Sequence, residues 1–200
     1  MYATNDQEIR EAFHKKKLKR KHEDKHTLVI DELGLMHGSS RIDIAVVNGC
    51  IHGFEIKSSK DTLSRFNDQL STYLKTMQKL TLVVAPNHLK GILELAPDWV
   101  GVIVAEKGAK GGIHFKTIRN TRKNPNVEAI SIAHLLWKGE TQALLEKLGV
   151  PSSVRRGTRL DLYKVLVSHI NLEELVRNIK VTFETRSNWR SGSQLMSGGD

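Results

Sequence analysis

The stretch that decides the fold is residues 41–57, RIDIAVVNGCIHGFEIK. Apolar residues alternate with other types on either side of Asn48 and Gly49. An Asn-Gly pair between two alternating runs is a strong signal for a β-hairpin. The sequence therefore predicts two antiparallel strands, residues 41–47 and 51–57, that are joined through Asn48-Gly49.

The register of this hairpin decides which side chains share a face. A two-residue turn would pair residue 47 with residue 50 and place Asp43 away from Glu55. A three-residue loop, residues 47–49, pairs residue 46 with residue 50, so that Asp43 faces Gly53 and lies diagonally beside Glu55. We predict the second register, with Gly49 at positive φ, because it gathers the apolar residues on one face. These are Ile42, Ile44, Val46, Phe54 and Ile56.

The other face of the hairpin carries Asp43, Glu55 and Lys57. Glu55 and Lys57 are two apart on one strand, so their side chains point to the same side. Two clustered carboxylates bind a hard divalent ion such as Mg²⁺, which polarises a phosphate and lowers the pKa of its bound water. A neighbouring lysine orients that water or stabilises the developing negative charge. The pattern therefore predicts hydrolysis of a phosphodiester.

Periodicity in the flanking sequence predicts the remaining elements of an α/β fold. Asn5 and Glu8 are spaced as a capping box, and the helix that they start runs on through residues 15–21. The other predicted elements are a strand at 27–33, a helix at 63–79, a strand at 80–85, a helix at 88–95, a strand at 100–106 and an edge strand at 113–118. This order, α-β-β-β-α-β-α-β-β, predicts a mixed sheet flanked by helices.

Asp43, followed by Glu55-Ile56-Lys57 on the next strand, resembles the signature of the PD-(D/E)XK nuclease superfamily. The α-β-β-β-α-β order is similar to the restriction-endonuclease-like core of that superfamily. Gln69 and Tyr73 lie four apart on one helical face and resemble the Gln-x-x-x-Tyr motif of RecB-type members. The resemblance covers residues 5–119, and residues 53–58 are similar to those of small stand-alone bacterial members.

The resemblance implies a set of roles for these residues. It implies catalytic roles for Asp43, Glu55, Lys57, Gln69 and Tyr73. It also implies Mg²⁺ (or Mn²⁺) as a cofactor, with Glu32, Asp43, Glu55 and Ile56 at the metal, and nucleic acid, in particular DNA, as the substrate. Ordinary structural roles are alternatives: Glu32 as a solvated strand end, Gln69 as an exposed helix residue and Tyr73 as a half-buried aromatic. A homodimer is compatible with cleavage of both strands.

The formal net charge of +9 and the pI of about 9.7 favour a polyanionic partner. The densest positive charge lies at the end of the first predicted helix. We predict phosphate contacts there, from Lys15, Lys16, Lys17, Lys19, Arg20 and Lys21. The alternative is a solvated basic helix end, which the helix dipole favours.

The pattern changes after a polar linker at residues 119–125. We predict a nuclease-like core at 1–125, a helical C-terminal region at 126–190 and a disordered tail at 191–200. The helices of that region are expected at 132–137, 141–148, 159–169 and 172–185. Arg155 and Arg156 lie between two of them and could contact nucleic acid as part of a helix-turn-helix. We favour the alternative, a helical subdomain that packs on the sheet or mediates dimerisation.

Composition excludes several classes of protein. The chain is 39% hydrophobic and 26% charged, which is a globular composition. Its single Cys50 has no partner for a disulfide or a zinc site, and no apolar run approaches membrane-spanning length or resembles a signal peptide. We therefore expect a cytoplasmic protein without a membrane partner. Two further functions stay open beside a nuclease: a non-catalytic module that binds nucleic acid or protein through the same fold, and a DNA-joining or repair subunit of a larger complex.

Overall fold

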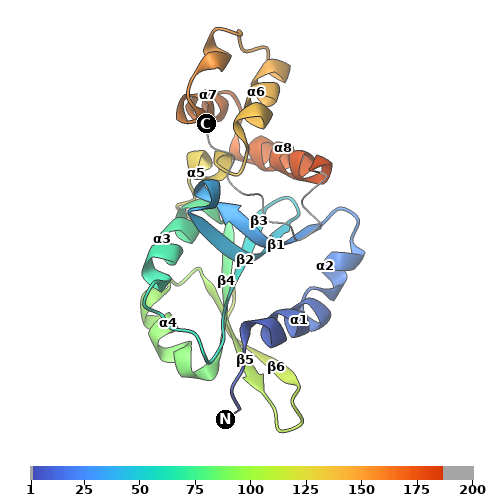
Figure 1. The fold of residues 1–200 in the computed structure, drawn as a ribbon, viewed down its shortest axis with the longest axis vertical. Helices are drawn as coiled ribbons and strands as arrows, with labels where there is room; N and C mark the ends of the chain where they lie inside the picture. The colour runs from blue at the N-terminus through green and yellow to red at the C-terminus, as the bar shows by residue number, and fades with distance from the viewer. Residues whose placement is uncertain (1, 187–200) are drawn as a thin grey trace.

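The computed structural model describes residues 2–186 (Figure 1). The predicted tail at 191–200 and the last residues of the predicted helical region, with Trp189, lie outside this part of the chain. None of the helices within residues 2–186 is both long enough and apolar enough to cross a bilayer.

A six-stranded sheet forms the centre of the fold, and its strands follow one another in sequence order. They are β1 (Leu28–Leu35), β2 (Ser40–Val47), β3 (Ile51–Lys57), β4 (Lys79–Val84), β5 (Gly101–Lys107) and β6 (Ile113–Arg119). β3, β4 and β5 are parallel, and the remaining neighbours are antiparallel. The predicted α/β class with a mixed sheet is confirmed, and β6 is an edge strand as predicted.

The helices lie on both faces of this sheet and at one end of it (Figure 1). They are α1 (Asp6–Lys16), α2 (Lys19–Glu23), α3 (Phe66–Thr76), α4 (Leu89–Leu95), α5 (Ala129–Ala133), α6 (Lys138–Lys147), α7 (Arg159–His169) and α8 (Leu172–Thr185). Figure 1 shows α1 and α2 on the side of the sheet opposite to α3 and α4, with α5 to α8 beyond the end of the sheet that carries β1. Asn5, Thr158 and Asn171 each start a helix through a capping box.

Two hydrophobic cores hold the layers together. On one face, Ile9 and Phe13 of α1 pack with Phe54 and Ile56 of β3. On the other face, one continuous core joins the sheet to α3 and to the C-terminal helices, and its members include Leu80, Ile132, Leu166 and Phe183. Burial of this kind is the main favourable term in folding. The C-terminal helical region is thus packed against the sheet; the boundary at residue 125 stays a prediction.

The predicted linker at residues 119–125 is part of this packing. Arg119 ends β6, and Asn124 is only 3% exposed. The Asn124 amide donates hydrogen bonds of 2.7 and 2.8 Å to the carbonyl oxygens of Leu74 and Met77. These carbonyls end α3, so the polar stretch caps a helix instead of forming a solvated linker.

Several predicted helix and strand ends are wrong. The first predicted helix ends at Lys16 instead of running to residue 21, because Leu18 turns into the core, where it is 3% exposed, and α2 starts separately at Lys19. The helix predicted for residues 63–79 spans Phe66–Thr76, since Met77 is buried in extended backbone immediately before β4. The helix predicted for residues 132–137 is α5, Ala129–Ala133. The prediction for α7 is confirmed at both ends.

The hairpin register differs from the prediction by two residues. Val47 pairs with Ile51 and Ala45 with Gly53, so the loop consists of Asn48, Gly49 and Cys50 and not of residues 47–49. The predicted pairing of residue 46 with residue 50 is therefore wrong. The predicted loop and the observed loop each have three residues. A shift of two residues does not change which side chains of a regular hairpin share a face. Gly49 has a φ of 67°, which confirms the predicted left-handed conformation.

Gly53 is expected to be required for the approach of α3 to the sheet. A Cβ atom there would lie 2.7 Å from Met77 Sδ and 3.2 Å from Ile42 Cγ1, closer than van der Waals contact allows. We expect Gly53→Ala to lower the free energy of unfolding by about 1–3 kcal/mol, the usual cost of overpacking a core. Urea denaturation measures this. Gly112→Ala is the control, because its Cβ would meet nothing within 4 Å; equal stability of the two variants would contradict the close approach.

Candidate active site

Glu55 is the buried acidic residue at the centre of the candidate site. It lies on β3 with only 2% of its surface exposed. Its Oε1 is 2.7 Å from Lys57 Nζ, and its Oε2 is 2.9 Å from the hydroxyl of Tyr73. Burial raises the pKa of Glu55, and the Lys57 ammonium acts in the opposite direction. The predicted placement of Glu55 and Lys57 on one side of the strand is confirmed by this ion pair.

Asp43 reaches the same strand from β2. Its Oδ2 accepts a 2.6 Å hydrogen bond from the backbone N–H of Ile56, and its Oδ1 lies 3.2 Å from Arg10 Nη2. Burial, and next the charge of Glu55, raise the pKa of Asp43 to about 7. The two carboxylates therefore sense each other, as two clustered acids do.

The β1–β2 ladder is interrupted beside Asp43, and its register is the same before and after the interruption. Pairs form on either side, Asp31 with Ile44 and Leu33 with Ile42, but the ladder skips Glu32 and Asp43. Glu32 has a φ of 56°, an uncommon conformation for a residue with a side chain. Across this interruption the two neighbouring apolar residues part: Ile42 joins the α3 core, and Ile44 joins the α1 core. The prediction that both lie on one apolar face is wrong for Ile42.

Sequence reasoning missed Arg10, which reaches Glu32 and Asp43 from α1. Its guanidinium bonds the side chain of Asp6 at 3.0 Å, Glu32 Oε1 at 2.6 Å, and both the carboxylate and the carbonyl oxygen of Asp43. These carboxylates raise the pKa of Arg10 even though burial acts to lower it. The i, i+4 spacing of Asp6 and Arg10 was the local signal for part of this network. The other candidate on α1, Glu8, caps the helix and pairs with Lys107 at 2.6 Å.

Gln69 and Tyr73, both on α3, each contact another residue that was predicted for the site. Gln69 Oε1 accepts a 3.1 Å hydrogen bond from Lys57 Nζ. The Tyr73 hydroxyl is also 2.7 Å from the carbonyl oxygen of Arg41, so its one proton is shared between that carbonyl and Glu55. Tyr73 is fully buried, and burial, then the charge of Glu55, raise its pKa. The two α3 residues thus hold the two ends of the Glu55–Lys57 pair.

Asp43 and Glu55 suit a hard divalent cation as a pair of ligands. Mg²⁺ is usually bound by one or two carboxylates, and water and substrate oxygens complete its coordination. Burial, and next the Glu55 charge, disfavour the ionised form of Asp43 and raise its pKa, and a bound cation would favour the ionised form. Within residues 2–186, no group of three or more His, Cys, Asp or Glu side chains is arranged to hold a metal. Glu32 pairs with Arg10 and Arg41, and Ile56 offers only backbone oxygen, so their predicted ligand roles stay predictions.

The predicted nucleic-acid contacts fall into two groups. Lys15, Arg20 and Lys21 are exposed and carry no ion pair within the described chain, whereas the Lys16 ammonium donates to the carbonyl oxygen of Ile113 at 2.6 Å. Lys17 lies over the ring of Phe115, and Lys19 is 3.9 Å from Glu23. In the C-terminal region, Arg155 is tied to Glu146 and to the carbonyl oxygen of Val150, while Arg156 is exposed. Arg155 therefore has a structural role at the end of α6.

This architecture is an α/β fold with an acidic cluster and a lysine on its central hairpin, and comparison with known proteins gives it a family. The chain belongs to the family described as bacteriophage P4 protein cII, which it matches over residues 3–195. It is 28% identical to protein cII of Enterobacteria phage P4 over 164 residues. That alignment covers 80% of this chain and 61% of the phage protein, so the chain spans less than two thirds of that relative.

A solved structure shares part of the architecture. A protein of unknown function from Silicibacter pomeroyi matches 75% of this chain and 93% of its own, with a TM-score of 0.46 and 16% identity. A likeness at this level carries no argument about function.

Asp43 is expected to make stability fall as the pH rises from about 4 to 7. Its pKa is 3.8 in the unfolded chain and about 7 in the folded one, so the folded state holds the proton more strongly over this window. We expect the resulting loss, on the order of 2 kcal/mol, to be largely absent in Asp43→Asn. Urea denaturation in EDTA at pH 4.5 and pH 8 measures it. Asp98→Asn, at a side chain that is 91% exposed, is the control; the same pH dependence in wild type and Asp43→Asn would contradict the assignment.

Proposed function

We propose that this protein is a metal-dependent nuclease of the PD-(D/E)XK type that hydrolyses phosphodiester bonds in DNA. The observation that carries the proposal is the burial of Glu55 against Lys57, with a second acid, Asp43, beside them. Burial, and next the charge of Glu55, raise the pKa of Asp43 to about 7. Perturbed acids that share a site with a positioned lysine favour a catalytic role. The Gln69 and Tyr73 contacts support the same function, because both side chains hold members of this group.

Each residue has a distinct task under this proposal. Asp43 and Glu55 would hold Mg²⁺ or Mn²⁺, which when bound supplies charge to the phosphate and lowers the pKa of water. Lys57 is 13% exposed, so its ammonium is fixed in place but can reach a reacting group. It would orient the attacking water or stabilise the developing negative charge. Gln69 and Tyr73 act as positioning residues, since they hold Lys57 and Glu55.

The charge of the molecule supports nucleic acid as the substrate. The net charge is +9, and unpaired basic side chains gather on α1 and α2. Both helices lie next to β1: His14 of α1 pairs with Asp31, and α2 contacts the strand. Such a surface attracts a phosphate backbone at any sequence. We propose DNA as the substrate because Gln69 and Tyr73 resemble the Gln-x-x-x-Tyr motif of RecB-type members. RNA is included as a substrate in the cleavage assays.

A second function is favoured by one specific observation. The Arg10 guanidinium, which always carries a positive charge, already pairs with Asp43 and Glu32. This pairing offsets part of the negative charge that would otherwise attract a metal ion. The same fold would then serve as a non-catalytic module that binds nucleic acid. Cleavage assays with and without a divalent ion distinguish the two functions.

Loss of Lys57 is expected to separate cleavage from metal binding. Lys57→Ala should retain Mn²⁺ binding, because both carboxylates remain, and should lower the cleavage rate at least about 100-fold, as loss of one charge-stabilising group does. Asp43→Ala and Glu55→Ala should lose both properties. Calorimetry with Mn²⁺ measures the binding, and gel assays on circular and linear, single- and double-stranded DNA and on RNA measure the cleavage.

Lys75→Ala is the matched control, because this lysine is exposed on α3 and its side chain has no contact with the site. It should cleave like the wild type. Normal cleavage by Lys57→Ala, or cleavage by the wild type in excess EDTA, would end the proposal. Binding of DNA in EDTA without cleavage in Mg²⁺ or Mn²⁺ would establish the non-catalytic module instead.

The exposed basic residues of α1 and α2 are expected to set the salt dependence of DNA binding. The triple substitution Lys15→Ala, Arg20→Ala, Lys21→Ala removes three charges that no carboxylate pairs with in the described chain. We expect weaker binding and a slope of log K against log salt that is flatter by about 0.9 for each phosphate that the variant no longer neutralises. Fluorescence anisotropy at several salt concentrations measures the slope.

Lys110→Ala, Lys138→Ala, Lys147→Ala is the control, since it removes the same charge from exposed lysines elsewhere on the surface. It should shift the slope much less. Equal slopes for the two triple variants would show that the basic residues of α1 and α2 do not contact the DNA and are ordinary solvated surface.

A further inference from the structure

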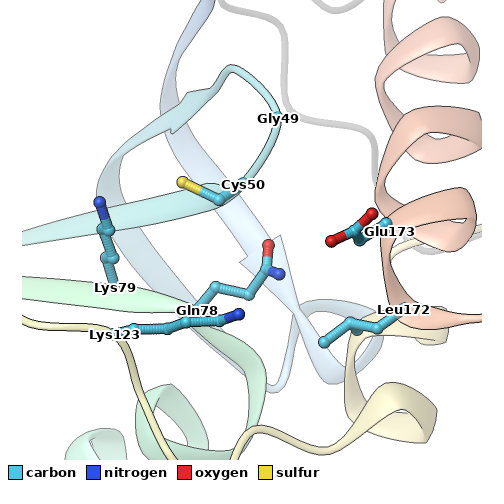
Figure 2. A pocket seen from close by; sticks show the side chains of 7 residues that line it. All are labelled: Gly49, Cys50, Gln78, Lys79, Lys123, Leu172 and Glu173. Carbon is cyan, nitrogen blue, oxygen red and sulfur yellow. The ribbon is translucent and has the colours of Figure 1, made fainter.

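A separate polar pocket lies at the other end of β3 from Glu55. Its volume is about 230 Å³, and its walls come from the β2–β3 loop, the start of β4, the segment after β6 and the first turn of α8 (Figure 2). Cys50 in its wall is five residues before Glu55, and a strand rises about 3.3 Å per residue, so the pocket is roughly 16 Å from the candidate active site. No role proposed above uses it.

Gln78 gives this pocket a fixed hydrogen-bond donor. The residue is only 4% exposed, and its Oε1 accepts a 2.8 Å hydrogen bond from the backbone N–H of Ile51. This bond fixes the orientation of the amide, so Nε2 is the end left to face the pocket. Figure 2 shows the amide nitrogen directed toward α8. Nε2 has no hydrogen-bond partner within residues 2–186, so it is available to a ligand in the pocket.

Charged side chains complete two opposite walls. Lys123 extends toward the pocket beside Gln78, and Glu173 lines the pocket from α8 with its carboxylate directed at it, whereas the Lys79 side chain points away from Gln78 in Figure 2. None of these three side chains forms an ion pair or side-chain hydrogen bond with another described residue. The pocket thus has cationic and N–H groups on one wall and a free acceptor on the other.

We propose that this pocket binds a nucleotide unit. The phosphate lies against Lys123 and the Gln78 amide, because an ammonium next to an N–H donor matches the charge and the oxygens of a phosphate. A hydrogen-bond donor of the sugar or base bonds Glu173 on the opposite wall. A simple anion would leave Glu173 unused and would be repelled by it. The volume equals that of about seven waters in the liquid, which is more than a phosphate ion alone needs.

The nucleotide unit has two sources, a free nucleotide or part of a nucleic-acid strand. The groups that recognise it are the same in both. The site does not depend on the proposed nuclease function, since it uses neither the carboxylate pair nor a divalent ion. Binding is therefore expected in EDTA.

The first test is titration of the full chain in EDTA with thymidine 5′-monophosphate, inorganic phosphate and thymidine, followed by calorimetry and by ¹H–¹⁵N NMR. We expect the monophosphate to bind at least tenfold more tightly than either fragment and to shift the side-chain NH₂ signal of Gln78. Equal affinity for inorganic phosphate, or an unmoved Gln78 signal, would overturn the proposal. Competition with a labelled oligothymidylate identifies the source: displacement indicates a strand, and its absence indicates a free nucleotide.

Substitutions test the two walls separately. Gln78→Glu keeps the acceptor for Ile51 but loses the donor, and Lys123→Ala removes an exposed ammonium; each should weaken binding of the monophosphate at least tenfold. Glu173→Gln should weaken the monophosphate and not inorganic phosphate. Lys110→Ala, in the β5–β6 turn, is the control and should bind normally. Melting temperatures report the fold, and if Gln78→Glu unfolds the chain, unchanged binding by Lys123→Ala still overturns the site.

Discussion

Burial of the Glu55 carboxylate in the central strand is the constraint on which the rest of the site depends. A carboxylate that leaves water is costly unless partners compensate it, and a buried ion pair breaks even only with good geometry. Lys57 compensates from the same strand at 2.7 Å and Tyr73 from α3 at 2.9 Å. Tyr73 reaches Glu55 because α3 lies close to the sheet, and Gly53 permits that approach. The position of α3 and the charge state of Glu55 are therefore coupled.

The second acid, Asp43, ties the two faces of the sheet together. Its position coincides with the interruption of the β1–β2 ladder, where Glu32 has a φ of 56°. A non-glycine residue in that region costs on the order of 1–3 kcal/mol and persists only where its surroundings fix it. Here Arg10 and Arg41 hold the Glu32 carboxylate at 2.6 and 2.7 Å. Because Arg10 comes from α1, the packing of α1 on one face determines the electrostatics of a site whose other partners come from the opposite face.

Much of this site could be predicted from short-range patterns. The spacing of Glu55 and Lys57, the helical spacing of Gln69 and Tyr73 and the positive φ of Gly49 each follow from local geometry. The register was wrong because loops at residues 47–49 and 48–50 have equal length and the same parity, so side-chain alternation does not distinguish them. Cross-strand contacts decide between the two.

The contributions of Arg10 and Ile42 could not be predicted in this way. Arg10 meets Asp43 33 positions later only because α1 docks on the sheet, which is a tertiary event. Ile42 and Ile44 lie in different cores because the ladder is interrupted at Glu32 and Asp43, and the alternation of neither strand indicates that interruption. The end of the first helix at Lys16 has the same origin, since burial of Leu18 outweighs the helix propensity of the lysines around it.

The partners of Arg10 bear on how the two proposed functions differ. Its guanidinium bonds Asp6 and Glu32 in addition to Asp43, and the Glu32 contact at 2.6 Å is shorter than the Asp43 side-chain contact at 3.2 Å. Arg10 can therefore release the Asp43 carboxylate while two other acids still neutralise it. In a nuclease this release would free Asp43 Oδ1, and the Arg10 charge on α1 would still be paired with Asp6 and Glu32. Oδ2 stays bonded to the Ile56 N–H, so the carboxylate stays held against β3. In a non-catalytic module the same contact would instead be permanent, and the network would serve only to hold α1 and the hairpin together.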